Sequence, residues 1–256
     1  MMMLRFIILR LLAGPDLAAT LYTLPSHAAA QDMTLTASDG VNIYGQLSRV
    51  STPRAPFILA FHMAGSNHAE YVPIVGKLNA AGFTVLAIDQ RSGGNGFGSR
   101  NKTVDGLGRS SSYDEALKDL EAAHAWAIAE AKGAPVLVWG SSYSAALVFV
   151  LAAKNPGTVS GVLAFSPGEY LGDNNRVHAA ASAVKVPVFV TQSPGSGEVK
   201  AARSIVAVIK SDDKTHFVGA VSGVHGSSSL RADANPKGAL EYWSAVLDFL
   251  KKFSLK

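Results

Sequence analysis

The sequence predicts a single α/β domain built on a mostly parallel sheet of eight strands, with helices on both faces. Short runs rich in Val, Ile and Leu alternate with segments of helical periodicity, and helices separate the later runs. A chain of 256 residues with 48% hydrophobic content is long enough to bury one substantial core. Strands are expected near 33–38, 41–48, 57–63, 84–90, 135–140, 160–166, 187–192 and 215–221, and helices near 68–81, 112–131, 143–154, 197–210 and 236–253.

The two N-terminal strands are predicted to pair as a β-hairpin. Asp39 and Gly40 lie between them, and an Asp-Gly pair is typical of a type I′ turn, in which both central residues have positive φ. The later strands are expected to run parallel, because predicted helices separate most of them.

The first 30 residues predict a secretory signal peptide, followed by the α/β domain over residues 31–256. Arg5 and Arg10 lie in a mainly apolar stretch, and the alanines at 28–30 supply the small residues that precede a cleavage site. No uninterrupted apolar run reaches the ~18–20 residues of a membrane-spanning helix, so a stable membrane anchor is not expected. We therefore expect an exported protein, periplasmic or secreted.

Composition and motifs argue against several classes of function. The net charge of +4 is mild and scattered, without a basic stripe interleaved with aromatic residues, so no nucleic-acid partner is expected. No His-Glu-x-x-His or comparable spacing is present, so no metal is predicted. The glycine-rich residues 93–98 do not fit a dinucleotide-binding loop, and no cofactor is predicted. The oligomeric state stays open.

Residues 135–145 carry the most informative motif of the chain. An apolar run over 136–139 predicts a buried strand, and a helical pattern follows from Ala145. The turn between them, Gly-Ser-Ser-Tyr-Ser at 140–144, follows the Gly-x-Ser-x-small pattern of a nucleophile elbow, which exposes a serine above the sheet edge. Ser142 is therefore the candidate nucleophile. The alternative is an ordinary strand-to-helix turn in which Ser142 caps the helix.

A histidine after the last predicted strand is the candidate general base. His225 is flanked by Gly226 and by Val224 in the loop that follows residues 217–221. In a strand–elbow–helix site of this kind, the serine, the acid and the histidine follow one another along the chain in that order. Within residues 31–256, the other histidines precede Ser142 or lie in helical, strand or polar segments: His62, His68, His124, His178 and His216.

The candidate acid is Glu198, the only acidic residue in the loop after the predicted strand 187–192. Glu198 also begins a helical run, where a carboxylate stabilises the helix dipole without any catalytic role. Its number falls between those of Ser142 and His225, as the expected order requires. Three other acids remain candidates outside that loop: Asp173, Asp212 and Asp213.

With these residues in place, the chain resembles the α/β-hydrolase superfamily, and most closely its compact branch of esterases and dienelactone-hydrolase-like enzymes. The strand at 57–61 followed by His-Met-Ala-Gly at 62–65 is similar to the strand that ends in His-Gly-x in that superfamily. The resemblance implies an α/β-hydrolase fold and an oxyanion hole formed by the backbone N–H groups of Ala64 and Tyr143. Met63 stands in place of the family glycine and is the alternative donor if the loop is shifted by one residue.

Some features depart from the family pattern. Dienelactone hydrolases proper use a cysteine nucleophile, and this chain contains no cysteine, so thiol chemistry is excluded. Residues 167–185 are too few for a substantial helical cap, which predicts an open, shallow site.

The segment that contains Asp89 and Arg91 also resembles a family segment. Both side chains are expected to be structural, paired with each other or with loop backbone.

These observations predict a serine hydrolase that cleaves small-molecule carboxylic esters through an acyl-enzyme on Ser142. His225 would act as general base, and Glu198 would orient it. Two alternatives stay open. One is a serine peptidase or amidase on the same fold, and the other is a non-catalytic binding protein, since fold alone does not decide function.

Overall fold

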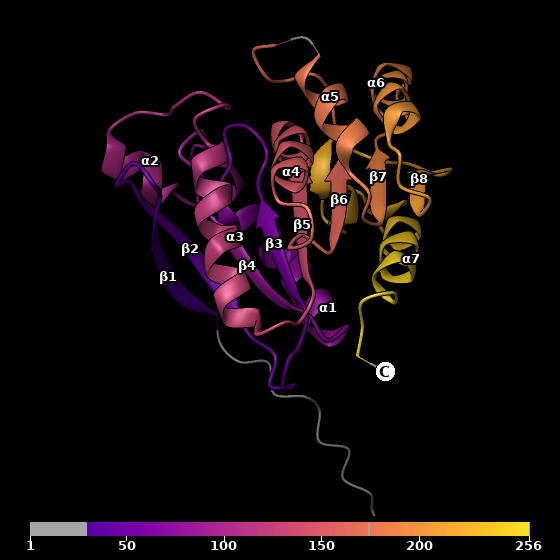
Figure 1. The fold of residues 1–256 in the computed structure, drawn as a ribbon. Coiled ribbons are helices and arrows are strands. Elements are labelled where there is room, and N and C mark those ends of the chain that lie inside the picture. The colour runs from indigo at the N-terminus through magenta and orange to yellow at the C-terminus, as the bar shows by residue number, and fades with distance from the viewer. Residues whose placement is uncertain (1–29, 174, 256) are drawn as a thin grey trace, which may run out of the picture.

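A computed structural model describes residues 30–173 and 175–255, and its centre is an eight-stranded sheet in the order β1-β2-β4-β3-β5-β6-β7-β8 (Figure 1). The six strands from β3 to β8 run parallel, while β2 is antiparallel to both β1 and β4. This confirms the predicted mostly parallel sheet. The strands are β1 (Gln31–Thr36), β2 (Asn42–Ser48), β3 (Phe57–Phe61), β4 (Thr84–Ile88), β5 (Val136–Ser141), β6 (Gly161–Phe165), β7 (Val188–Gln192) and β8 (Lys214–Val218).

Helices cover both faces of the sheet, as predicted (Figure 1). One face packs against α1 (Val72–Ala80) and α7 (Ala239–Leu250). The other face packs against α3 (Leu117–Ala131), α4 (Tyr143–Lys154), α5 (Arg176–Ala183) and α6 (Ser196–Val208). The sequence patterns missed the short helices, which lack enough turns to develop a clear apolar period: η1 (His68–Tyr71, predicted as part of α1), η2 (Gly96–Gly98), α2 (Lys102–Leu107), α5 and η3 (Gly226–Leu230).

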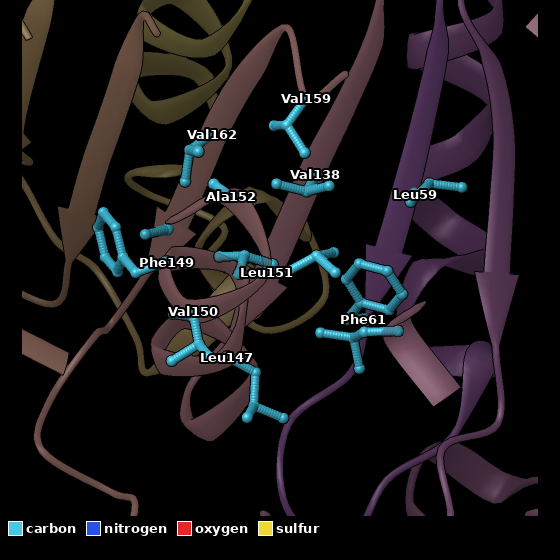
Figure 2. Close-up of a cluster of buried hydrophobic side chains, with 14 of the residues drawn as sticks. Leu59, Phe61, Val138, Leu147, Phe149, Val150, Leu151, Ala152, Val159 and Val162 are labelled. Atoms are coloured by element: carbon cyan, nitrogen blue, oxygen red, sulfur yellow. The ribbon is translucent and has the colours of Figure 1, made fainter. Parts of the chain in front are cut away.

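The central strand β5 joins the two layers of the core. Its side chains alternate between the faces, so Val138 packs with the α4 layer (Figure 2) and Trp139 with the α7 layer. The indole of Trp139 is fully buried and stacks on Phe165, with ring centroids 4.6 Å apart. Its Nε1 donates a hydrogen bond to Ser227 Oγ at 2.9 Å. The core therefore holds the loop after β8 against the end of β5.

The N-terminal hairpin forms, but its turn differs from the predicted type. Gly40 has φ +83°, whereas Asp39 is not among the residues with positive φ, so a type I′ turn is wrong. Ala37 pairs with Val41, and the Gly40 N–H donates to the Ala37 carbonyl at 2.9 Å. The loop therefore has three residues with glycine in the left-handed position. Asp39 forms an ion pair with Arg91.

The connection between β6 and β7 contains only the eight-residue helix α5, which confirms the prediction of no substantial cap. Within the described part of the chain, no helix combines the length and the apolar character needed to cross a bilayer. The predicted signal peptide lies outside the described residues, apart from Ala30.

Candidate active site

The turn from β5 into α4 has the backbone of a nucleophile elbow. Ser142 lies between the two elements with φ +59° and ψ −122°, a conformation that non-glycine residues rarely adopt. A Cβ built on Gly140 would lie 2.2 Å from the Ser144 carbonyl oxygen, so only glycine fits there. The tight turn therefore requires Gly140 and holds the Ser142 side chain at the carboxyl edge of the sheet.

Ser144, which replaces the second glycine of the usual motif, has a structural function of its own. Its hydroxyl is fully buried and donates to the His62 carbonyl at 2.6 Å. It also accepts a hydrogen bond from Gln90 Nε2 at 2.8 Å. The substitution thus ties the first turn of α4 to the loops after β3 and β4.

The structure brings together all three residues that the sequence proposed as a triad. Ser142 Oγ lies 2.8 Å from His225 Nε2, and His225 Nδ1 lies 3.0 Å from Glu198 Oε1. The three side chains come from segments that follow β5, β8 and β7, which all end at the same edge of the sheet. Such a chain of hydrogen bonds can pass a proton from a serine hydroxyl to an imidazole that a carboxylate orients.

The surroundings of Glu198 keep its carboxylate ionised. Its Oε2 accepts hydrogen bonds from Ser166 Oγ at 2.7 Å and from the Ser193 N–H at 3.2 Å. Burial by itself raises the pKa of Glu198, but the hydrogen bonds from His225, Ser166 and Ser193 outweigh it and lower the pKa to about 2. Ser166 also accepts the Gly226 N–H at 2.9 Å, which fixes the loop that carries the histidine.

Two of the other candidate acids are engaged elsewhere. Asp173 accepts a hydrogen bond from the backbone of Asn175, and Asp213 pairs with Lys252. Among the described residues, Glu198 is the acid that contacts His225.

The backbone donors of the predicted oxyanion hole lie on two segments. Tyr143 is the first residue of α4, where N–H groups have no acceptor within the helix. The Met63 N–H donates to Glu70 Oε2 at 2.8 Å and is therefore engaged. Ala64 follows at an exposed turn, so of the two alternatives Ala64 is the residue whose N–H stays available.

Glu70 is a fully buried carboxylate beneath the site that the sequence analysis missed. Besides Met63, it accepts the hydroxyl of Ser141, the residue before the nucleophile, at 2.6 Å. Ser141 Oγ in turn accepts the Ser227 N–H at 2.9 Å. One carboxyl group therefore joins the loop after β3, the elbow and the segment after His225.

A signal for this position exists in the sequence. Glu70 lies four residues before Ile74, which lies four before Leu78, and both apolar residues are fully buried. Helical spacing thus places the acid on the core-facing side. Burial raises the pKa of Glu70 to about 7, against the lowering effect of the hydrogen bonds from Ser141 and Met63.

Glu70→Gln is expected to remove part of the pH dependence of folding stability. The folded-state pKa of Glu70 is raised from 4.5 to about 7, so the stability it contributes is present below pH 4.5 and lost as pH rises through 7. The loss is on the order of 3 kcal/mol. Glutamine is neutral, like the protonated carboxyl, so the variant should not show this loss of stability as the pH rises. Urea unfolding at about pH 5 and about pH 8 measures the difference between variant and wild type.

The surface variant Glu121→Gln, which breaks an exposed ion pair with Lys154, serves as the control and should follow the wild type. Asp119 also has a pKa raised by burial, to about 6, but its contribution is common to all three proteins. Parallel pH curves for wild type and Glu70→Gln would contradict the assignment.

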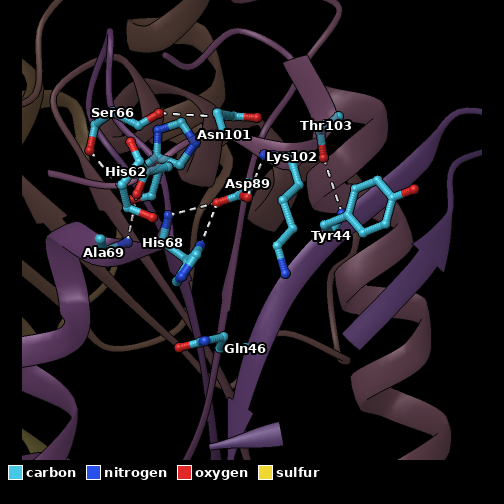
Figure 3. A network of polar contacts seen from close by, with 12 residues as sticks. Tyr44, Gln46, His62, Ser66, His68, Ala69, Asp89, Asn101, Lys102 and Thr103 are labelled. Carbon is cyan, nitrogen blue, oxygen red and sulfur yellow. Dashed lines mark hydrogen bonds and ion pairs between the residues drawn. The ribbon is translucent and has the colours of Figure 1, made fainter. Parts of the chain in front are cut away.

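A polar network supports the loops around the site (Figure 3). Buried Asp89 accepts the His68 N–H at 2.9 Å and the Lys102 N–H at 2.9 Å, and pairs with the His68 ring at 2.7 Å. Arg91 instead pairs with Asp119 and Asp39. Both residues are structural, but the expectation that they might pair with each other is wrong, because each finds partners on a different side of the loop.

The site opens toward the surface on the side of the histidine. The side chain of His225 is 41% exposed, whereas Ser142 is only 8% exposed.

This fold and this site define an α/β-hydrolase. Residues 52–215 match the model of the family described as "Serine aminopeptidase, S33", and the chain belongs to that family. The matched segment includes Ser142 and Glu198 and ends before His225. No curated protein matches the chain.

Solved structures of similar fold include three enzymes from prokaryotes. An esterase of Pyrococcus furiosus is 19% identical, with a TM-score of 0.65 over 88% of this chain and 93% of that one. A dienelactone hydrolase of Anabaena variabilis is 17% identical, with a TM-score of 0.62 over 88% and 99%. A thermostable carboxyl esterase of Bacillus coagulans is 13% identical, with a TM-score of 0.65 over 88% and 99%. At these identities the likeness concerns the fold.

Proposed function

We propose that the protein is a serine hydrolase that cleaves carboxylic esters of small molecules through an acyl-enzyme on Ser142. The observation that carries this proposal is the continuous chain of hydrogen bonds from Ser142 through His225 to Glu198, with heavy-atom distances of 2.8 and 3.0 Å. Those distances lie within the range in which a nucleophile and its base exchange a proton.

The proposed reaction begins when the Ser142 hydroxyl attacks the carbonyl carbon of the ester. His225 Nε2 removes the hydroxyl proton and then delivers it to the departing alkoxide, so that an alcohol leaves. Glu198 accepts a hydrogen bond from Nδ1, holds the imidazole in the required tautomer and stabilises the imidazolium. Water, activated by the same histidine, attacks the acyl-enzyme and releases the carboxylic acid.

The negative charge that develops on the carbonyl oxygen would be held by the N–H groups of Ala64 and Tyr143. Tyr143 contributes as the first residue of α4, where the helix dipole also favours negative charge. Loss of one such donor typically costs ~3–4 kcal/mol of transition-state stabilisation. Glu70 supports this arrangement, because it holds the loop that precedes Ala64 through the Met63 N–H.

A panel of p-nitrophenyl esters from acetate to octanoate tests the proposal. We expect measurable turnover and labelling of Ser142 by a fluorophosphonate, because a serine activated by an adjacent base attacks both carbonyl and phosphonyl centres. If the folded protein hydrolysed no ester and did not react with the probe, the proposal would be contradicted. That result would favour the alternative of a non-catalytic binding protein.

A second candidate, a serine peptidase or amidase, is favoured by the description of the matching family. The same panel distinguishes it when aminoacyl p-nitroanilides are added. The ester proposal expects kcat/KM for the best ester to exceed that for the best anilide. The reverse order would establish the peptidase. We also propose that residues 1–30 direct export, which fractionation of cells that express the full chain would test.

A further inference from the structure

An open cleft of about 380 Å³ is formed by the segment before α3 and the connection after β6. It is lined by Ser111, Ser112, Tyr113, Asp114 and Tyr170. The first four residues precede α3, and Tyr170 lies in the connection after β6. Two of the five lining side chains are therefore aromatic, and they come from segments far apart in the sequence.

Tyr113 is held in place by the first residue of α4. Its ring stacks on that of Tyr143, with centroids 4.2 Å apart and planes inclined by 15°. Tyr143 is fully buried, and its hydroxyl accepts hydrogen bonds from Ser92 Oγ at 2.7 Å and Gln90 Nε2 at 2.8 Å. Because the supporting ring cannot move, Tyr113 presents a fixed aromatic surface next to the elbow.

Tyr170 lies against the triad. Its hydroxyl donates to the Ser166 carbonyl at 3.3 Å, and Ser166 Oγ binds Glu198. Burial raises the pKa of Tyr170, the charge of Glu198 raises it further, and a hydrogen bond with Ser142 acts in the opposite direction. Tyr170 is nevertheless 38% exposed. The two tyrosines of the cleft thus contact Tyr143 and Ser166, which adjoin the proposed triad, and Tyr170 keeps aromatic surface open to a ligand.

The charges around the cleft do not suit an ionised ligand. Asp114 is its one charged lining residue, and its carboxylate is engaged by Arg176 and by the Gly172 N–H. An anionic group would meet this carboxylate, and a cationic group would compete with Arg176. The hydroxyls of Ser111 and Ser112 add neutral polar surface. An uncharged ring with polar substituents fits this lining.

We propose that this cleft binds an aromatic ring in the acyl or the alcohol part of the substrate, so that the enzyme prefers uncharged aryl-bearing esters to alkyl esters of the same size. The inference rests on the proposed ester hydrolysis and names its substrate class. Tyrosine rings attract a planar aromatic ring by stacked and edge-on contacts that a saturated ring cannot make. The preference expected from such contacts is roughly 3- to 10-fold in kcat/KM.

Two pairs of esters test the preference, and within each pair a planar phenyl ring is replaced by a saturated cyclohexyl ring of similar size. One pair varies the acyl part, methyl 3-phenylpropanoate against methyl 3-cyclohexylpropanoate, and the other varies the alcohol, benzyl acetate against cyclohexylmethyl acetate. Hydrolysis is followed by titration of the released acid. We expect the aryl ester to be favoured in at least one pair. Equal rates within both pairs would overturn the inference and leave ester hydrolysis itself intact.

Variants of the two tyrosines connect the preference to the cleft. The aryl preference in kcat/KM should fall in Tyr170→Leu and in Tyr113→Leu. It should be retained in Tyr170→Phe and Tyr113→Phe, which keep the aromatic ring. Tyr44→Leu, which removes a ring from β2 on the opposite side of the sheet order, should behave as wild type. An aryl preference that is unchanged in both leucine variants would overturn the assignment to this cleft. Absence of any ester hydrolysis in the wild type would instead contradict the proposed function.

Discussion

Ser142→Ala is expected to lower kcat for the best ester substrate by a factor on the order of 10⁶ while the protein stays folded. The variant removes the atom that would form the acyl-enzyme, and neither His225 nor Glu198 can replace it. Folding should survive, because the Ser142 N–H donates to the Phe165 carbonyl at 2.8 Å through the backbone, which alanine retains. Ester hydrolysis, fluorophosphonate labelling and thermal unfolding measure these outcomes.

Ser142→Gly sharpens this test. The residue has φ +59°, which glycine adopts without strain, so this variant should be inactive and about 1 kcal/mol more stable than the alanine variant. Ser204→Ala removes an exposed hydroxyl from α6 and should keep full activity. Residual turnover in Ser142→Ala within tenfold of wild type would mean that another group attacks the ester.

Glu198→Gln is expected to lower kcat by a factor on the order of 10³–10⁴, with a smaller change in KM. Glutamine preserves the size of the side chain but removes the negative charge that stabilises the imidazolium, and its amide can favour the wrong tautomer of His225. The carboxylate has a pKa of about 2, so the wild type keeps it ionised throughout the neutral range. The defect should therefore persist at every pH above this value at which the protein is folded.

The pH dependence of stability provides a second measurement on the same variant. A folded-state pKa lowered from 4.5 to about 2 means that Glu198 stabilises the fold above pH 4.5 and loses this effect as pH falls through 2. The variant should therefore lack part of the acid-induced loss of stability. Glu130→Gln, which breaks an exposed ion pair with Arg49, is the control and should keep wild-type kcat. If Glu198→Gln kept the wild-type kcat, Glu198 would not be the acid of the triad, and another carboxylate would have to fill that role.

The sheet and the elbow could be predicted because their signals are local. Buried strands are short apolar runs, and the turn after β5 combines Gly140 with Ser142 directly before a helical pattern. The positions of Ser142 and His225 along the chain then matched the order expected of this architecture. The short helices were missed because they contain too few turns for a clear apolar period, and the predicted turn type of the hairpin was wrong.

Glu198 illustrates an intermediate case. The sequence analysis favoured Glu198 for its place in the loop after the predicted strand 187–192, and it left Asp173, Asp212 and Asp213 as alternatives. Selection among them depends on distances across the sheet edge, and there the structure brings Glu198 Oε1 to 3.0 Å from the histidine. The contacts of the Glu70 carboxylate beneath the site were harder to predict, because Glu70 lies 71 residues before its hydrogen-bond partner Ser141.

The sequence by itself determined the order of strands and helices, the strained serine turn and the types of residue available for acyl transfer, because periodicity and turn chemistry act between near neighbours. The tertiary structure decided which acid meets His225, why a serine is accepted at position 144, and how Tyr113 and Tyr170 form one cleft. Those features depend on packing between segments distant in the chain, and no local pattern encodes the distances that such packing produces.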